Sequence, residues 1–221
     1  MTLRLQIDFV SDVACPWCAV GLFSLDEALR RTADVVTADI TFQPFELNPD
    51  MAAAGENLDE HIAGKYRTSP EQIAAGREPL RARSASVGFA FNSSARSRVY
   101  NTFDAHRLLH WARDFNLHRE LKRALFKANF TDDLNVSNTE VLVGIAESVG
   151  LDATQAREVL HSQRYATEVR NAEKLWQSRG IQSVPGMVVN QKWLISGGQP
   201  PEILEQALRN IAAELAPGSK A

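Results

Sequence analysis

The two cysteines of this 221-residue chain lie three positions apart, in the tetrapeptide Cys15-Pro16-Trp17-Cys18. A structural disulfide stabilises a fold mainly by closing a long loop in the unfolded chain, and two intervening residues give little of that effect. A zinc site needs about four protein ligands, but the five histidines lie far from the pair and no second cysteine pair exists. The spacing therefore favours a reversible thiol–disulfide pair, and no metal site is expected.

The segments on either side of the pair predict a strand, a helix and a second strand. Residues 3–10 alternate apolar and polar side chains, which is the period of a strand. From Pro16 to Arg31 the apolar residues recur at helical spacing, and residues 39–45 form a second β-rich run. Pro44 is expected at the end of that run because it cannot donate to a β-ladder. This order is typical of a parallel α/β unit.

The middle of the chain, from Leu58 to about Arg179, shows helical periodicity and no convincing strand. One helix is expected to begin after Ser137, which stands three residues before Glu140 in the spacing of a capping box, and to end near Gly150. We interpret the whole block as one inserted subdomain. The other helices expected in it cover residues 71–84, 97–114, 118–129, 152–160 and 163–179.

The end of the chain returns to strands. Two β-rich runs at residues 187–190 and 192–195 flank the turn dipeptide Asn190-Gln191, which predicts a hairpin, and Pro201 opens an amphipathic helix. Without the helical block, this order is the thioredoxin topology. We therefore expect an α/β fold of the thioredoxin type with a large all-helical insertion. The expected division is a thioredoxin-like domain at residues 1–48 and 180–221 and a helical insertion subdomain at residues 49–179.

The predicted elements place Cys15 at the N-terminus of the first helix. Backbone N–H groups and the helix dipole favour an anion there, and the thiolate is the nucleophile in disulfide exchange. Cys18 lies one turn further along, so we expect it to be more buried and to attack a mixed disulfide formed at Cys15. Pro16 suits the first helical turn, where its missing N–H is not needed.

Composition excludes several other classes of protein. The formal net charge is -3 and no long basic run appears, so binding to nucleic acid or to anionic membranes is not expected. No apolar run approaches the roughly 18 residues of a membrane span. Residues 1–8 lack the long apolar core of a signal peptide. We therefore expect a cytoplasmic protein.

Several short motifs accompany the cysteine pair along the chain. They are Ser-Asp-x-x-Cys-Pro-Trp-Cys at 11–18, Pro-Phe-Glu-Leu-Asn-Pro at 44–49, Asp-Ala-His-Arg-Leu at 104–108, Ser-Val-Pro at 183–185 and Ser-Gly-Gly-Gln at 196–199. In combination they resemble the DsbA-like family, and within it the FrnE-type branch, which is often grouped with 2-hydroxychromene-2-carboxylate isomerases and kappa-class glutathione transferases. The resemblance implies a thioredoxin fold with a helical insertion. It also implies a cis Pro185 packed opposite Cys15, with the backbone of Val184 holding a substrate strand or glutathione.

Substrate contacts are therefore expected at Pro16, Trp17, Ser183 and Val184. The chain departs from the family pattern at two places, because Ser183 stands where glycine is frequent and residues 186–187 replace a frequent aromatic residue. The first change is expected to alter contacts near the thiolate, and the second to widen the pocket.

Two acidic residues are candidates for proton transfer to or from Cys18. Asp8 lies on the first expected strand and Asp12 in the loop before the pair, and a buried carboxylate there can accept the thiol proton. The alternative is an ordinary solvated carboxylate. His106 and His110 stand four apart as in a zinc helix, but Arg107 occupies the position of the catalytic glutamate, so a packed helix face is the favoured interpretation. The tryptophans Trp111, Trp176 and Trp193 are interpreted as core or interface aromatics.

These observations predict a DsbA-family protein disulfide oxidoreductase with a redox-active disulfide and no bound cofactor. Its expected partner is a protein or a small molecule carrying a thiol or disulfide, with glutathione as a candidate co-substrate. One alternative is a glutathione-dependent isomerase or transferase acting on small aromatic substrates, although those branches usually carry serine at the position of Cys15. A second alternative is a non-catalytic, chaperone-like binding module. The sequence leaves open the direction of electron flow and the choice between monomer and homodimer.

Overall fold

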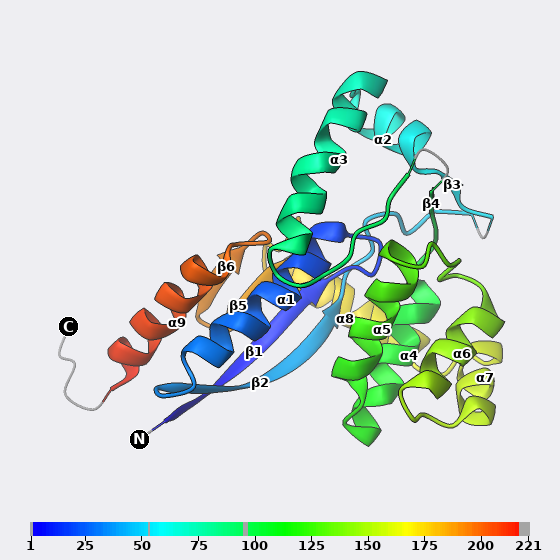
Figure 1. The fold of residues 1–221 in the computed structure, drawn as a ribbon. Helices are drawn as coiled ribbons and strands as arrows, with labels where there is room; N and C mark the ends of the chain where they lie inside the picture. Colours follow the sequence, from blue (N-terminus) through cyan, green and yellow to red (C-terminus); the bar gives the residue numbers. More distant parts are fainter. Residues whose placement is uncertain (1, 53, 95–96, 217–221) are drawn as a thin grey trace.

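The computed structural model describes residues 2–52, 54–94 and 97–216. The strands of its central sheet are β1 (Leu3–Ser11), β2 (Val36–Pro44), β5 (Gly186–Val189) and β6 (Trp193–Ser196). They lie in the order β2-β1-β5-β6 (Figure 1), with β1 parallel to β2, antiparallel to β5, and β5 antiparallel to β6. This sheet confirms the predicted fold class, a thioredoxin-type α/β fold with a helical insertion.

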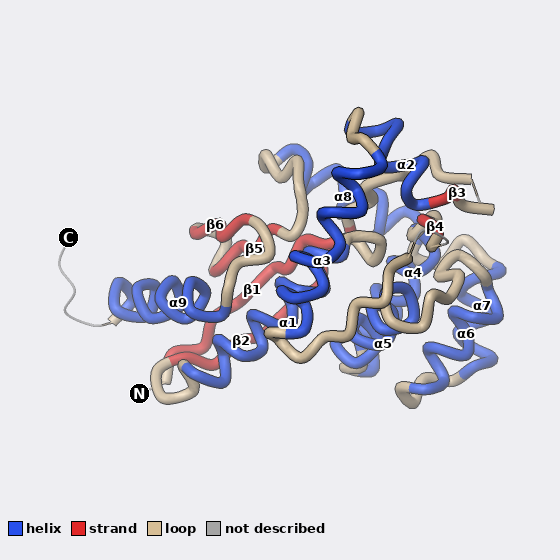
Figure 2. The backbone as a smooth tube through the Cα atoms, turned by 45° about the horizontal axis from the view of Figure 1, so that its top comes forward, coloured by secondary structure: helices blue, strands red, loops and turns tan. Residues whose placement is uncertain are grey.

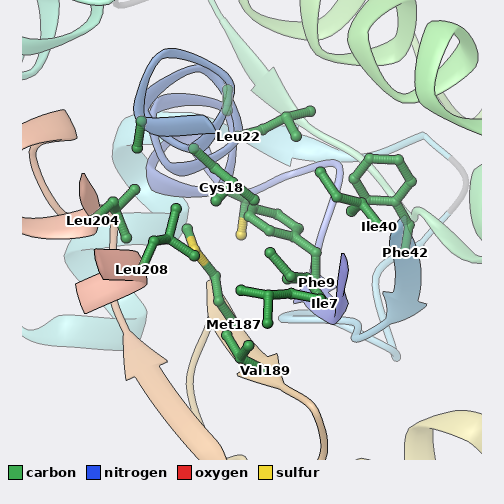
Figure 3. Packing of buried hydrophobic residues seen from close by; sticks show 14 of the residues in the cluster. Ile7, Phe9, Cys18, Leu22, Ile40, Phe42, Met187, Val189, Leu204 and Leu208 are labelled. Atoms are coloured by element: carbon green, nitrogen blue, oxygen red, sulfur yellow. The ribbon is translucent and has the colours of Figure 1, made fainter. Parts of the chain in front are cut away.

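Helices cover both faces of the sheet. They are α1 (Pro16–Arg31), α8 (Ala166–Ser178) and α9 (Pro201–Leu215). Side chains of β1 alternate between the faces, so that Ile7 and Phe9 point into the core beneath α1 and α9 (Figure 3), whereas Val10 packs against Trp176 of α8. Cys18 belongs to the same cluster as Phe9, which places the second cysteine of the pair inside the main core.

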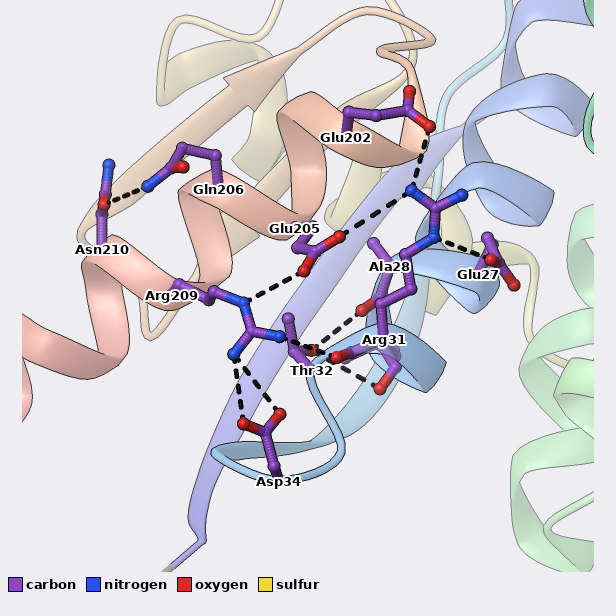
Figure 4. Close-up of polar contacts among 11 residues, drawn as sticks. Glu27, Ala28, Arg31, Thr32, Asp34, Glu202, Glu205, Gln206, Arg209 and Asn210 are labelled. Atoms are coloured by element: carbon purple, nitrogen blue, oxygen red, sulfur yellow. Dashed lines mark hydrogen bonds and ion pairs between the residues drawn. The ribbon is translucent and has the colours of Figure 1, made fainter.

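An ion pair, a hydrogen bond and apolar packing fasten α9 to α1. Arg31 Nη1 donates to Glu202 at 2.9 Å, and Arg209 Nη2 donates to the backbone oxygen of Arg31 at 2.8 Å (Figure 4). Exposed ion pairs of this kind contribute about 0.2–1 kcal/mol each. Leu204 and Leu208 are fully buried in the main core, and each such side chain contributes about 1.5–3 kcal/mol. Apolar burial therefore holds α9 in place more than the ion pairs do.

The segment between β2 and α8 supplies the helical block beside the sheet (Figures 1 and 2). Its helices are α2 (Leu58–Tyr66), α3 (Pro70–Ala85), α4 (Phe103–Trp111), the short 3-10 helix at Ala112–Phe115, α5 (His118–Phe130), α6 (Thr139–Ser148) and α7 (Ala153–His161). A second hydrophobic core lies among α4 to α7 and includes Leu121 and Leu125 of α5. Phe126 of the same helix packs instead into the main core. Helix α5 therefore belongs to both cores.

The structure corrects several predicted boundaries. Arg98–Val99 forms strand β4, which pairs with β3 (Glu56–Asn57), so the segment from Leu58 to Arg179 does contain a strand and the helix predicted at 97–114 begins only at Phe103. A ladder of two residues is too short to show a period in the sequence. The predicted Pro44 end of β2 and the start of α9 at Pro201 are confirmed. The division into two domains stays a prediction.

The cap of α6 also differs from the prediction. Asn138, and not Ser137, precedes the helix, and its side-chain oxygen accepts from the N–H of Val141 at 3.1 Å. The Ser137 hydroxyl donates to the side chain of Asn135 at 2.7 Å instead. Ser137 and Asn138 both have side chains suited to an N-cap. Asn138 takes this position, while the Ser137 hydroxyl is bonded to Asn135.

Candidate active site

Cys15 stands immediately before α1, as the sequence predicts. Its backbone is extended (φ -98°, ψ 111°) and Pro16 occupies the first position of the helix. The thiol makes no capping hydrogen bond, and its Sγ lies 3.7 Å from the carbonyl oxygen of Val184, which it faces as a donor. Cys15 therefore occupies the N-cap position of α1, the end of a helix that attracts negative charge.

The segment opposite the thiol contains the cis peptide bond between Val184 and Pro185 that the family resemblance implies. Pro185 is buried against α1, where a Cβ added to Gly21 would lie only 3.1 Å from the proline ring. Val184 is half-buried and contacts the thiol through its carbonyl oxygen, whereas Ser183 before it is exposed. The structure therefore brings Val184 and Pro185 to Cys15.

A second loop closes over the start of α1. A Cβ added to Gly198 would lie 2.9 Å from the carbonyl oxygen of Trp17, so only a glycine allows the chain to approach this closely. The Trp17 side chain is 43% exposed and lies beside this loop. Trp17 and Pro16 therefore present a partly apolar surface next to the cysteine pair.

Cys18 is the buried member of the pair, as predicted. It is fully inaccessible, whereas Cys15 retains 5% of its exposure, and both are free cysteines. Burial raises the pKa of the Cys18 thiol well above its usual range, and the neighbouring Cys15 adds to this effect. The charge of Lys122 and the backbone N–H of Asp12 act in the opposite direction. Cys18 is therefore kept as a neutral thiol unless a nearby group accepts its proton.

Asp12 ties the loop before the pair to the helical block. Its carboxylate accepts from the Thr102 hydroxyl at 2.7 Å, from the N–H of Leu47 at 2.7 Å and from the N–H of Ala14 at 3.1 Å. The Nε2 atom of His106 lies 3.5 Å from Asp12 Oδ1. Burial alone would raise the pKa of Asp12, but His106 and these donors outweigh it and lower the pKa. Asp12 therefore stays ionised at neutral pH and holds the loop in place.

Asp8, the other predicted proton-transfer residue, faces away from the thiols. Its neighbours Ile7 and Phe9 point into the core that contains Cys18, so the alternation of the strand directs Asp8 to the opposite face. There its carboxylate accepts from the side chain of Gln43 at 2.7 Å. The structure therefore brings Asp12, and not Asp8, to the cysteine pair.

Lys122 is a residue near the pair that the sequence analysis did not single out. It lies on α5, is fully buried, and feels the charges of Cys18, Asp12 and Cys15. Burial lowers its pKa to about 8 against the pull of those three groups. A signal was present in the sequence, because this lysine sits beside Leu121 in the apolar stripe of a helix.

The remaining candidates have structural roles. Arg107 donates to Asp104 at 2.7 Å and to backbone carbonyls of the segment 159–164. Trp111 and Trp176 are buried in the cores, as predicted, and Trp193 packs at the edge of the main core. Across the described ranges, no group of three or more His, Cys, Asp or Glu side chains is arranged to hold a metal ion.

The family model described as the DSBA-like thioredoxin domain matches residues 6–209 of the chain. The chain belongs to this family. A probable DsbA oxidoreductase from Streptomyces coelicolor is 34% identical to this DsbA-like chain, with a TM-score of 0.89, and the match covers 98% of this chain and 94% of the other. The family and this relative identify the chain as an oxidoreductase or a related enzyme.

More distant DsbA-like structures share the fold. A 2-hydroxychromene-2-carboxylate isomerase has a TM-score of 0.70 at 14% identity, covering 96% of this chain and all of the other (100%). The cytosolic disulfide reductase DsbM from Pseudomonas aeruginosa, in a structure with GSH, has a TM-score of 0.63 at 13% identity, covering 93% and 98%. These neighbours agree with the predicted FrnE-type branch. Within the described part of this DsbA-like chain, no helix is both long and apolar enough to cross a membrane.

Proposed function

We propose that the chain is a thiol–disulfide oxidoreductase that uses Cys15 and Cys18 as a dithiol–disulfide pair. The placement of Cys15 carries this proposal. Its thiol stands before the first turn of α1 and 3.7 Å from the carbonyl oxygen of Val184, while Cys18 is buried one turn behind it. A nucleophile at the helix start that keeps 5% of its exposure, with a fully buried partner behind it, suits two-step disulfide exchange.

In the first step, the thiolate of Cys15 attacks a substrate disulfide. A bond forms between Cys15 Sγ and one substrate sulfur, and the other substrate sulfur leaves as a thiolate that takes up a proton. The helix N-terminus favours the attacking anion and also makes Cys15 a good leaving group in the return reaction. The exposed Trp17 ring offers apolar contact to the substrate beside the new bond.

In the second step, Cys18 attacks Cys15 and releases the remaining substrate sulfur as a thiol. The two cysteines end as a disulfide and the substrate is reduced; in the reverse direction the pair oxidises a dithiol. The Cys15 thiol raises the pKa of Cys18, so the attacking sulfur lies close to its target, which supports this step. Burial of Cys18 reserves it for this internal reaction.

The proposed partners are protein or small-molecule thiols and disulfides, including glutathione, with no bound cofactor. Within the described residues, the N–H of Val184 has no hydrogen-bond partner, so it is free to pair with the extended backbone of a substrate. The DsbM structure with GSH supports glutathione as a candidate, since that protein has the same fold.

Exchange of each cysteine for serine tests the proposal. In an insulin reduction assay, Cys15→Ser is expected to have no activity, because the nucleophile is lost. Cys18→Ser is expected to accumulate a substrate joined to Cys15, which mass spectrometry detects before and after reduction. The Cys15→Ser variant is the matched control for trapping, because it keeps Cys18 and should carry no adduct. Full activity in Cys15→Ser contradicts the proposal.

The same variants separate the two alternatives. A glutathione-dependent isomerase or transferase would bind glutathione tightly and turn over small aromatic substrates after Cys18→Ser. A chaperone-like module would prevent aggregation of unfolded proteins equally well without either cysteine. We expect neither result, because neither activity needs two cysteines placed next to each other.

A further inference from the structure

Two buried carboxylates meet between α8 and the segment that follows β2. Glu46 and Glu173 are both buried, and the Nη1 atom of Arg170 donates to an oxygen of each, at 2.8 Å for Glu173. Their other oxygens, Oε1 in both residues, are buried and have no hydrogen-bond partner within the described residues. Because both carboxylates bond to one nitrogen atom, they are close neighbours that share a single positive charge.

This arrangement has one negative charge more than the guanidinium balances. When two like charges share a buried site, one of the groups keeps its proton to a higher pH than usual. Burial and then the charge of Glu173 raise the pKa of Glu46 to about 7. Arg170 acts against this rise, and Asp12 adds to it. From α4, the uncharged ring of Phe103 lies with its centre 3.9 Å from Cζ of Arg170. The pair therefore changes its charge near neutral pH.

The carboxylate pair lies between two segments that border the Cys15 thiol. Leu47, directly after Glu46, donates its N–H to Asp12 at 2.7 Å, and Asp12 accepts in turn from the loop before the cysteine pair. On the other side, the chain continues from α8 into Val184, whose carbonyl oxygen faces the thiol. A change of charge in the pair therefore acts on segments that hold the thiol from two directions.

We propose that this carboxylate pair and Arg170 form a pH-sensitive latch, which keeps the Cys15 site closed while the pair holds a proton. When the proton passes to solvent, two negative charges face one guanidinium, and Glu46 regains hydration by moving away from α8. Leu47 moves with it and loses its bond to Asp12, so the thiol, which keeps only 5% of its exposure in the closed arrangement, becomes more accessible. The latch regulates the site of the proposed function, so its effect on the reaction rests on that function.

The direction and the pH window follow from where the proton is bound. In the closed arrangement Glu46 keeps its proton up to about pH 7, whereas a hydrated Glu46 returns toward its ordinary pKa of 4.5. The closed arrangement binds the proton more tightly, so it is favoured at low pH and is lost as the pH rises. The ratio of open to closed molecules should rise by up to about tenfold per pH unit between about 4.5 and 7, and then level off.

The backbone N–H of Leu47 reports on the latch, because its hydrogen bond to Asp12 is broken in the open arrangement. Hydrogen exchange of this amide is followed by NMR and corrected for the intrinsic effect of pH. In the wild-type protein its protection should fall at least about tenfold between pH 5 and 7. Glu46→Gln keeps the shape and an acceptor for Arg170 but removes the titrating group, so its protection should not depend on pH.

Alkylation of Cys15 by iodoacetamide, located by mass spectrometry, measures the accessibility of the thiol. The thiol itself titrates in both proteins, so the ratio of the wild-type rate to the Glu46→Gln rate isolates the latch. This ratio should rise at least about threefold between pH 5 and 7. Glu168→Gln is the matched control, because Glu168 is an exposed carboxylate in the first turn of α8. It should match the wild-type protein in both measurements.

Each result decides one step. Equal protection of Leu47 in the wild-type protein and Glu46→Gln at every pH overturns the latch, and a constant ratio of alkylation rates overturns its control of the thiol. Should Glu46→Gln not fold, Glu173→Gln also leaves one carboxylate for the guanidinium and should lose most of the change between pH 5 and 7. Neither measurement involves a disulfide. If Cys15→Ser keeps full activity in insulin reduction, the proposed function fails, whereas the protection of Leu47 still decides on the latch.

Discussion

Replacing the buried Lys122 with methionine is expected to raise the free energy of unfolding of the protein. The two side chains are unbranched and similar in length, so methionine can occupy the same slot with little change in packing. The pKa of the lysine falls from its ordinary 10.5 to about 8 in the fold. A change of one in pKa corresponds to about 1.4 kcal/mol, so burial of the ammonium costs the folded state about 3 kcal/mol.

The sign and the pH window follow from where the proton is bound. Below the folded pKa of about 8, both the folded and the unfolded chain carry the ammonium, and the full cost is present. Between about 8 and 10.5 the folded state sheds its proton first, so the unfolded chain binds more protons and the stability of the wild-type protein rises with pH. Lys122→Met is therefore expected to be about 3 kcal/mol more stable near neutral pH, with the gain shrinking as the pH rises toward 10.

Urea unfolding of the reduced proteins, followed by circular dichroism at several pH values, measures this difference. Lys127→Met serves as the control, because Lys127 lies on the same helix and its exposed ion pair with Asp132 contributes at most about 1 kcal/mol. The reasoning is refuted if Lys122→Met is less stable than the wild-type protein near neutral pH, or if its gain is the same at every pH.

Three further changes test other parts of the site. Gly198→Val is expected to destabilise the fold by about 1–3 kcal/mol, because the new Cβ would lie 2.9 Å from the Trp17 carbonyl oxygen. Thermal unfolding measures this loss. Gly76→Ala is the control and should not destabilise the fold, because a Cβ at Gly76 has no neighbouring atom within 4 Å. Asp12→Asn should be less stable than the wild-type protein near neutral pH. Because the pKa of Asp12 is lowered in the fold, the ionised carboxylate stabilises the wild-type protein above the ordinary carboxyl pKa, and this stabilisation is lost as the pH falls through the folded pKa. Unfolding measured in acid should therefore show no difference between the two proteins. Burial and the neighbouring carboxylate of Glu173 raise the pKa of Glu46 to about 7. The folded protein therefore binds the proton more tightly than the unfolded chain, and its stability should fall as the pH rises from about 4.5 to 7. Urea unfolding at several pH values should show that Glu46→Gln removes this part of the slope, and an unchanged slope would contradict the assignment.

Much of the fold could be predicted from local patterns. The alternation in residues 3–10, the helix from Pro16 and the hairpin around Asn190 all have periods or turn residues that are visible within a short window. The strand at Arg98–Val99 has no such signal, because its pairing with β3 depends on residues about 40 positions away. The boundary at Arg98–Val99 was therefore wrong because a distant partner, and not the local sequence, decided the conformation.

The candidate site divides in the same way. The placement of Cys15 and Cys18 followed from a four-residue motif between a strand and a helix, and Val184 and Pro185 came from the family resemblance. The alternation in residues 3–10 places Asp8 on the face opposite Ile7 and Phe9, but the sequence does not show which of the two faces carries the cysteine pair. Lys122 was missed because its distance to the pair along the chain is large and only the packing of α5 brings it close.

Helix α5 connects the two cores, and this position decides how deeply Lys122 is buried beside the cysteine pair. Leu121 and Leu125 anchor the helix among α4, α6 and α7, whereas Lys122 and Phe126 enter the main core beside Cys18. Any displacement of α5 would open the space around the ammonium to water, and a hydrated lysine returns toward its ordinary pKa. The pKa of Lys122 is therefore set by the packing of the insertion against the thioredoxin-type sheet. Leu125→Ala should raise that pKa from about 8 toward its ordinary value, which NMR titration of the labelled lysine side chain measures, and an unchanged midpoint would contradict the argument.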